Sequence, residues 1–309
     1  MKATKIMRKA TAALMGSAAV LVWAGAVQAS CVTIQPAVVN EVRLDPLAVG
    51  APGQLLQPFS LTFNRATAQG EPWIVHYQIV DEDSVLRARV GASTGPAIEF
   101  QSRDTNREIT VARNEGFTPL RAGRVTMEAD HVSAQAELFL RLTDLREDLA
   151  AGAYREGFTV RYWCDADNPA PYEAAGVVLT TVVVPNVISA NIAGASASGE
   201  IDFLDFAMLS RRLQVSVRST GPFEVTARSV NGGALLRDSA GPNADAADQI
   251  SYQAWIDGRA LALSGAVLPF DRAGLTGRLL SLDVEVEPVE DKRAGSYADT
   301  LLLTLTPAN

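Results

Sequence analysis

The sequence has 309 residues, of which 48% are apolar and 20% charged, and a formal net charge of −8 at pH 7. Its length suits about two domains of ~100 to 200 residues each. The acidic balance excludes nucleic acid as the expected partner, because phosphate contacts need clustered lysine and arginine.

The first 29 residues have the pattern of a secretory signal sequence. Four Lys and Arg residues within the first nine precede an apolar run from 10 to 26 and the small-residue pattern Val27-Gln28-Ala29. We predict cleavage after Ala29 and export through the periplasm to the cell surface. The alternative is a transmembrane anchor, but this run is short, and no later run approaches the ~20 apolar residues that a membrane helix needs. Cleavage would leave 23 basic against 35 acidic residues, a formal charge of −12.

Cys31 and Cys164 are the two cysteines of the chain. Export would place them in an oxidising compartment, where pairing is the default. We predict a disulfide that closes a loop of 134 residues. In the chain-entropy model such a bridge contributes up to ~5 kcal/mol of stability. Two free thiols are the alternative.

Short strands at regular spacing are predicted for the first domain, which we place at residues 30–184. Turns rich in Gly, Pro, Asn and Asp separate the strands, and this pattern favours a β-sandwich or barrel. The predicted strands are 32–43, 59–64, 73–80, 97–101, 108–112, 136–143 and 158–164. After a loop at 165–172, one further apolar, β-branched strand is predicted at 177–184.

The second domain is predicted at residues 185–309. Its expected strands are 213–217, 223–230, 250–256, 261–263 and 279–286, and a final alternating strand at 301–306. Asp257-Gly258 is expected to form a hairpin turn, and 194–199 and 237–248 are expected to be loops.

A turn sequence occurs twice. Ala-Gly-x-Tyr begins at Ala151 and again at Ala294, 143 residues later, and an alternating strand follows each copy. The repeat indicates a duplicated domain. The first copy is followed by the strand at 177–184, whereas the second ends with Pro307, Ala308 and Asn309. We therefore expect the second domain to lack its last strand.

No enzyme active site, cofactor site or metal site is predicted. His76 lies in a predicted strand and His131 in a predicted turn, and neither has a second His or Cys nearby in the sequence. Gly-x-Ser-x-Gly elbows, phosphate loops and dinucleotide fingerprints are absent from the sequence. Acidic stretches at 81–83 and 243–248 lack EF-hand spacing, so solvated turns are the simpler interpretation and calcium sites the alternative.

Export, two β-domains and the closing motif together resemble the spore coat protein U domain family, the subunits of archaic chaperone-usher pili. The match is Gly295, Tyr297, Asp299 and Thr300 with the strand behind them, where the family shows Gly-x-Tyr-x-Asp-Thr and an alternating final strand. The first copy departs from this pattern with Glu156 and Gly157. The closing motif covers about thirteen residues, and two-domain members of such systems are similar to tip adhesins.

The resemblance implies an all-β fold of two immunoglobulin-like β-sandwich domains, the second completed by a donor strand. It implies three partners, which are a periplasmic pilus chaperone, an outer-membrane usher and a neighbouring subunit that donates a strand. No cofactor is implied. The residues expected to line the donor-strand groove are Tyr297, Leu301, Leu303 and Leu305.

The resemblance also implies a role in attachment or biofilm formation. Because Cys31 follows the predicted cleavage site closely and is expected to be tied to Cys164, we expect no free arm to donate and hence a position at the pilus tip. Candidate contacts to an abiotic or host surface are Trp73, Phe117, Pro119 and Leu120. The main alternative is a free secreted or periplasmic β-sandwich binding protein with no pilus role, and a secreted hydrolase is a third interpretation.

Overall fold

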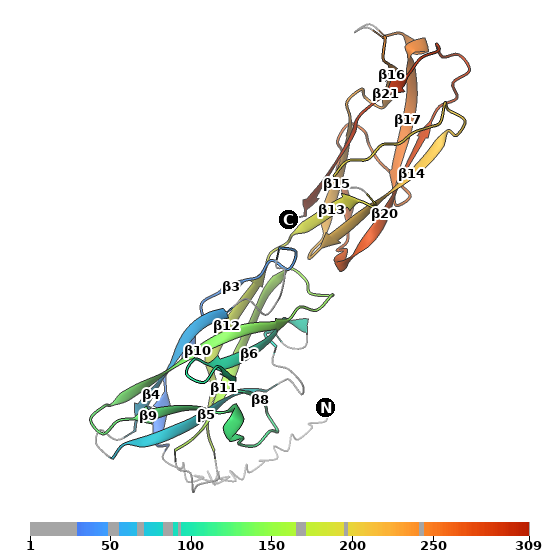
Figure 1. The fold of residues 1–309 in the computed structure, drawn as a ribbon. Helices are drawn as coiled ribbons and strands as arrows, with labels where there is room; N and C mark the ends of the chain where they lie inside the picture. Colours follow the sequence, from blue (N-terminus) through green and yellow to red (C-terminus); the bar gives the residue numbers. More distant parts are fainter. Residues whose placement is uncertain are drawn as a thin grey trace, which may run out of the picture. The chain divides into compact units, whose positions relative to one another are not determined.

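The structure is a computed structural model, and it describes residues 30–48, 56–66, 71–82, 89–91, 94–164, 171–194, 197–240 and 244–308. Nearly all of its regular structure is β-strand, which confirms the all-β fold class (Figure 1). In the described ranges the helices are two short 3-10 turns, η3 (Pro119–Arg121) and η4 (Ala246–Asp248). None of the described helices is long and apolar enough to cross a membrane. The predicted signal sequence, residues 1–29, lies outside the described residues.

Strands β1 to β12 form the first sandwich, which has two sheets. The five-stranded sheet has the order β1 (Val32–Ile34), β4 (Leu56–Arg65), β10 (Ser133–Asp144), β6 (Ala97–Ser102), β7 (Arg107–Glu108). The seven-stranded sheet has the order β2 (Ala37–Val38), β12 (Tyr172–Val184), β11 (Gly152–Trp163), β5 (Trp73–Asp81), β8 (Thr110–Ala112), with β3 (Val42–Arg43) beside β12 and β9 (Gly123–Met127) beside β5.

The core of the first sandwich lies between these sheets because alternate residues of each strand are apolar. In β10, Leu138, Leu140 and Leu142 are buried, and the residues between them face outward. Aromatic rings connect the sheets: Phe100 of β6 meets Phe158 of β11 edge to face, with 5.0 Å between ring centroids. These contacts make one continuous apolar cluster.

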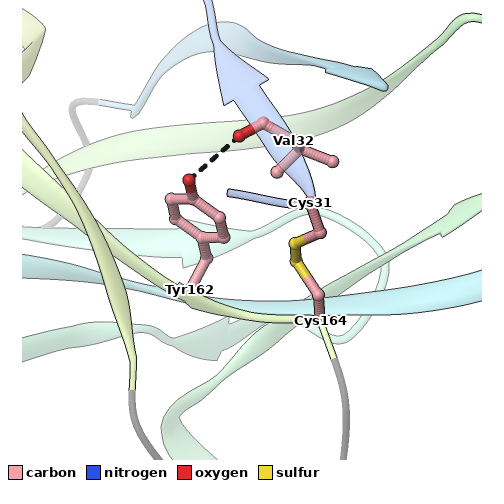
Figure 2. Close-up of a disulfide and its surroundings, with 4 residues drawn as sticks. All are labelled: Cys31, Val32, Tyr162 and Cys164. Atoms are coloured by element: carbon pink, nitrogen blue, oxygen red, sulfur yellow. Dashed lines mark hydrogen bonds between the residues drawn. A yellow bond between two sulfur atoms is a disulfide. The ribbon is translucent and has the colours of Figure 1, made fainter. Parts of the chain in front are cut away.

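The disulfide predicted from the sequence joins the two sheets of the first sandwich. Cys31 lies just before β1 and Cys164 just after β11, and their Cα atoms are 6.2 Å apart. Beside it, the Tyr162 hydroxyl donates a hydrogen bond of 3.0 Å to the Val32 carbonyl (Figure 2). Both links fasten the short edge strand β1 to the opposite sheet.

Strands β13 to β22 form the second sandwich. One sheet has the order β13 (Ile188–Ile192), β14 (Ser210–Ser219), β20 (Gly274–Val286), β17 (Gln249–Ile256), β16 (Ala234–Arg237), β21 (Tyr297–Ala298), with β18 (Arg259–Ala260) beside β17. The other has three strands, β19 (Leu268–Phe270), β15 (Phe223–Ser229) and β22 (Leu301–Pro307). In Figure 1 these strands run from yellow to red.

The core of the second sandwich follows from the same alternation. Leu280, Leu282 and Val284 of β20 are buried and face β15, which contributes Phe223 and Val225. The expected hairpin turn is present, since Asp257 and Gly258 both have positive φ, +53° and +76°, as a type I′ turn requires.

Several elements were missing from the sequence-based prediction. The short strands β9, β13, β16 and β19 were not predicted, because each pairs over only a few residues at the margin of a sheet. The segment between β13 and β14 was also given no structure, although it proves to matter for the candidate site. The predicted strand at 177–184 is present as the longer β12, which begins at Tyr172.

Candidate functional site

The repeated Gly-x-Tyr turn has the same geometry in both sandwiches. Gly152 and Gly295 have φ of +154° and +152°, a region that favours glycine. Two residues later, the hydroxyl of Tyr154 donates to the Ala150 carbonyl at 2.8 Å, and that of Tyr297 donates to the Arg293 carbonyl at 2.5 Å. In each case the tyrosine closes the turn onto the residue four positions earlier. The motif therefore fixes where the following strand begins.

Asp299 holds the start of β22 against its neighbours. Its carboxylate accepts hydrogen bonds from the Ser229 hydroxyl at 2.5 Å, the Tyr252 hydroxyl at 2.6 Å and the Asn231 backbone N–H at 3.1 Å. Burial, and then the hydrogen bond to this carboxylate, raise the pKa of Tyr252 above its ordinary value. The neighbouring Thr300 carbonyl accepts from the Val230 N–H at 3.0 Å. The four motif residues thus have structural roles that set the position of β22.

Strand β22 has a neighbouring strand on one side. It pairs antiparallel with β15, from Ser229 opposite Leu301 to Phe223 opposite Pro307. In the described part of the chain no strand pairs with its other edge. Leu302 on the outer face is 58% exposed, and Leu301, Leu303 and Leu305 face the core yet remain half-exposed.

The first sandwich shows what is missing from the second. Moving back by the 143-residue offset, the counterparts of the three leucines in β11 are Phe158, Val160 and Tyr162, which are 1%, 0% and 3% exposed. They are buried because β11 lies between β5 and β12. The second sandwich has β15 in the place of β5 and, among its described residues, no strand in the place of β12. The half-exposed leucines therefore mark the position of an absent strand.

An open groove of about 1040 Å³ occupies this position. One edge is β13, the outermost strand of its sheet, and the other is β22. All four residues predicted for the groove, Tyr297, Leu301, Leu303 and Leu305, line it. The apolar side chains that sequence reasoning missed come mainly from β13, β14 and β20 and are Ile188, Ile192, Leu213, Val215, Leu282 and Val284. The apolar alternation of Ile188, Ala190 and Ile192 was the available signal for β13.

The lining residues of the groove include no lysine or arginine. Their acidic members are Asp299, which is engaged by the three hydrogen bonds above, and Glu200, Asp202 and Asp205 in the segment between β13 and β14. The groove floor is apolar, so its occupant is expected to present apolar side chains at every second residue.

The segment between β13 and β14 crosses part of this groove. We call residues 199–209 the strap. Its three consecutive residues Leu204, Asp205 and Phe206 have φ of +48°, +55° and +61°. A left-handed conformation costs roughly 1 to 2 kcal/mol for each non-glycine residue. The strap is therefore held in a strained conformation by its surroundings.

The surface-contact candidates Phe117, Pro119 and Leu120 lie together on the exposed segment 113–122 of the first sandwich, with Leu120 67% exposed. Trp73 does not join them. It packs on the core of that sandwich under the guanidinium of Arg65, 5.7 Å from the ring centroid.

Segment 113–122 is firmly anchored. Arg161, itself 6% exposed, donates hydrogen bonds to the carbonyls of Arg113 at 2.9 Å and Glu115 at 2.6 Å. The ring of Phe117 packs on Trp163, with 4.6 Å between centroids. Two exposed apolar side chains are therefore presented from a fixed support.

The other titratable candidates have structural surroundings. Burial, and then the charge of Arg124, lower the pKa of His76. Two acidic residues expected in solvated turns are buried instead: Asp81 is 3% exposed and accepts from the Arg89 N–H, and Asp248 is 5% exposed and pairs with Arg237 and Arg293. That correction arises because backbone and arginine donors surround both carboxylates. Among the described residues no group of three His, Cys, Asp or Glu side chains is placed to hold a metal ion.

No family model and no curated protein matches the chain. Solved structures similar to it include the CsuC–CsuE chaperone–tip adhesion subunit pre-assembly complex from archaic chaperone-usher Csu pili of Acinetobacter baumannii (10% identity, 89% of this chain and 99% of that chain, TM-score 0.42). They also include CfaE, the adhesive subunit of CFA/I fimbria of enterotoxigenic Escherichia coli (11%, 89% and 94%, 0.40), and the CupB6 tip adhesin of Pseudomonas aeruginosa (14%, 89% and 93%, 0.39).

Proposed function

We propose that this chain is a subunit of an archaic chaperone-usher pilus, that it occupies the tip, and that its second sandwich is completed by a strand donated from another chain. The observation that carries the proposal is the row of core-facing, half-exposed leucines, Leu301, Leu303 and Leu305, beside an open groove. The same position in the first sandwich is filled by β12. Because an unpaired strand edge and an apolar groove invite aggregation, such a domain needs a periplasmic chaperone before assembly.

The occupant we propose is an alternating apolar β-strand, supplied first by the chaperone and then, at the usher, by the neighbouring subunit. In the first sandwich the core-facing residues of β12 are Val178, Thr180, Val182 and Val184, all buried at 2% exposure or less. A donor for the groove should present a similar row to Leu301, Leu303 and Leu305. Burial of each large apolar side chain contributes ~1.5 to 3 kcal/mol before ordering costs.

A peptide that copies residues 172–185 tests this function directly. We expect it to bind the exported full chain, and Leu303→Asp to weaken binding by at least about a hundredfold, because the new carboxylate would be buried against the peptide's valines. Leu302→Asp is the matched control, since Leu302 is the adjacent residue and faces solvent. The measurement is fluorescence anisotropy of the labelled peptide.

Two results would argue against this function. The first is equal binding of the peptide to both variants, which would place the peptide elsewhere. The second is an absence of binding to the unmodified chain together with a stable monomer, which would favour the free β-sandwich binding protein instead.

We propose further that the first sandwich makes the contact with an abiotic or host surface, and so mediates attachment and biofilm formation. Phe117 and Leu120 are exposed, and Arg161 holds their segment in place. Beads coated with the Leu120→Asp variant are expected to be retained severalfold less on a hydrophobic surface than beads coated with the unmodified chain. Val132→Asp is the control, because Val132 is 63% exposed on a different turn of the same sandwich. Equal losses for both variants would show a general charge effect and would contradict a contact at segment 113–122.

A further inference from the structure

The strap reaches from one side of the groove to the other. At its start, Gly199 lies so close to Ile192 of β13 that a Cβ there would be 3.1 Å from its side chain. At its centre, Phe203 is 9% exposed and belongs to the core of the second sandwich. Further along, Phe206 meets Tyr297 edge to face, with 6.1 Å between ring centroids. The strap therefore covers the part of the groove next to the Gly-x-Tyr turn, and it is drawn in yellow between β13 and β14 in Figure 1.

Two aromatic rings fill this part of the groove. Phe203 and Phe206 stack with 6.2 Å between centroids and an interplanar angle of 12°. Both rings line the groove together with Leu301 and Leu303. They cover apolar surface that an incoming strand would also cover, so the rings and such a strand compete for the same space.

The backbone of the strap is weakly held. Within residues 199–208, the backbone-to-backbone hydrogen bond present in the described structure is a single turn, from the Ala207 N–H to the Leu204 carbonyl at 3.1 Å. The three left-handed residues lie in this turn. Few backbone hydrogen bonds and local strain are typical of segments that open at low cost.

The first sandwich shows the same part of the chain in a filled state. There, residues 37–44 follow the edge strand β1 and pair in parallel with β12 through β2 and β3. Val39, Val42 and Leu44 are buried, at 1% to 3% exposure. The strap follows β13 in the corresponding order but, among the described residues, pairs with no strand. Its aromatic rings turn into the groove instead.

We propose that the strap is a gate: it closes the Tyr297 end of the groove while the groove is empty, and an entering strand displaces Phe203 and Phe206. This inference rests on the proposed function, since it assumes that a strand enters the groove. The closed strap protects part of the apolar surface before a partner arrives. Its strain keeps the closed state from being so stable that it excludes the partner.

The gate predicts rate changes of opposite sign for two variants. Phe206→Ala removes both ring contacts of the plug and is expected to speed strand entry by about tenfold or more. Leu204→Asn is expected to slow entry by about threefold to fivefold, because asparagine tolerates the left-handed conformation better than leucine and so favours the closed strap. Leu204 is 54% exposed, so its replacement removes little buried surface.

Each variant has a matched control in the same strap. Met208→Ala shortens a side chain that is 50% exposed and is not among the groove-lining residues. Leu204→Ala removes the same leucine without favouring the left-handed conformation. Both controls are expected to leave the entry rate within about twofold of the unmodified chain. Phe206→Leu, which keeps most of the bulk without the ring, replaces Phe206→Ala if the latter fails to fold.

The experiment is stopped-flow mixing of the exported full chain with the labelled peptide of residues 172–185, at several peptide concentrations. Faster entry for the Phe206 variant and slower entry for Leu204→Asn, with unchanged controls, support the gate. Peptide entry at one common rate in all variants overturns the gate and leaves the proposed function standing. If neither the unmodified chain nor any variant takes up peptide, the groove accepts no strand, and both the gate and the proposed function fall.

Discussion

A complementing strand fused after Asn309 is expected to raise the unfolding temperature of the second sandwich by at least about 10 °C and to leave the transition of the first sandwich unchanged. The fused strand would copy β12, residues 172–184, behind a linker of the same length as residues 164–171, which join β11 to β12. β12 is antiparallel to β11, so this linker allows the fused strand to lie antiparallel to β22.

The expected gain comes from apolar burial. Three core-facing valines of the fused strand would enter the groove, at ~1.5 to 3 kcal/mol each, and the half-exposed leucines of β22 would lose their remaining contact with water. Backbone hydrogen bonds to the free edge of β22 would add to this, and ordering of the strand would offset part of it. A net gain of about 3 kcal/mol already corresponds to roughly 10 °C, because 1 kcal/mol shifts a sandwich of this size by about 4 °C.

Differential scanning calorimetry of the exported chain, with and without the fusion, measures both transitions in one scan. The control fusion carries aspartate at the positions that copy Val178, Val182 and Val184, and it should give no gain. If the unfused chain already shows two stable transitions and the fusion shifts neither, the second sandwich needs no further strand, and a self-contained binding protein becomes the better account.

The sequence was most informative where a residue pattern has one physical interpretation. Alternation in Leu301 to Thr306 predicted β22 and its core-facing leucines, and the structure places those leucines in the groove lining. The repeated Gly-x-Tyr turn predicted a duplication, and the two tyrosines do make the same hydrogen bond. Such patterns act locally, over a few neighbouring residues, so one sequence is sufficient to show them.

Contacts between distant segments were harder to predict. The left-handed turn of the strap contains no glycine or asparagine, the residues that usually signal it, because packing of Phe203 and Phe206 imposes the conformation. Asp248 was expected to be solvated, but Arg237 and Arg293 approach it from other parts of the chain. Arg161 gave no signal in the sequence, although it anchors segment 113–122 through two carbonyls.

Replacing both cysteines with serine is expected to lower the stability of the first sandwich by up to about 5 kcal/mol, the chain-entropy value for so long a loop. The bond spans 133 positions, and it fastens β1, a strand of three residues whose one neighbour in its sheet is β4. Without it, the Tyr162 hydrogen bond to the Val32 carbonyl would be the nearest remaining link between β1 and β11.

Tyr162→Phe calibrates this prediction, because it removes that hydrogen bond alone and should cost about 1 kcal/mol. Urea unfolding of the exported chain would resolve both losses, and the second sandwich acts as an internal control because both cysteines of the chain belong to the first. A shift confined to the first transition fits a bridge that restrains the unfolded chain locally. An equal shift of both transitions would instead mean that the two sandwiches unfold as one cooperative unit, in which case the fused strand would have to raise both transitions together.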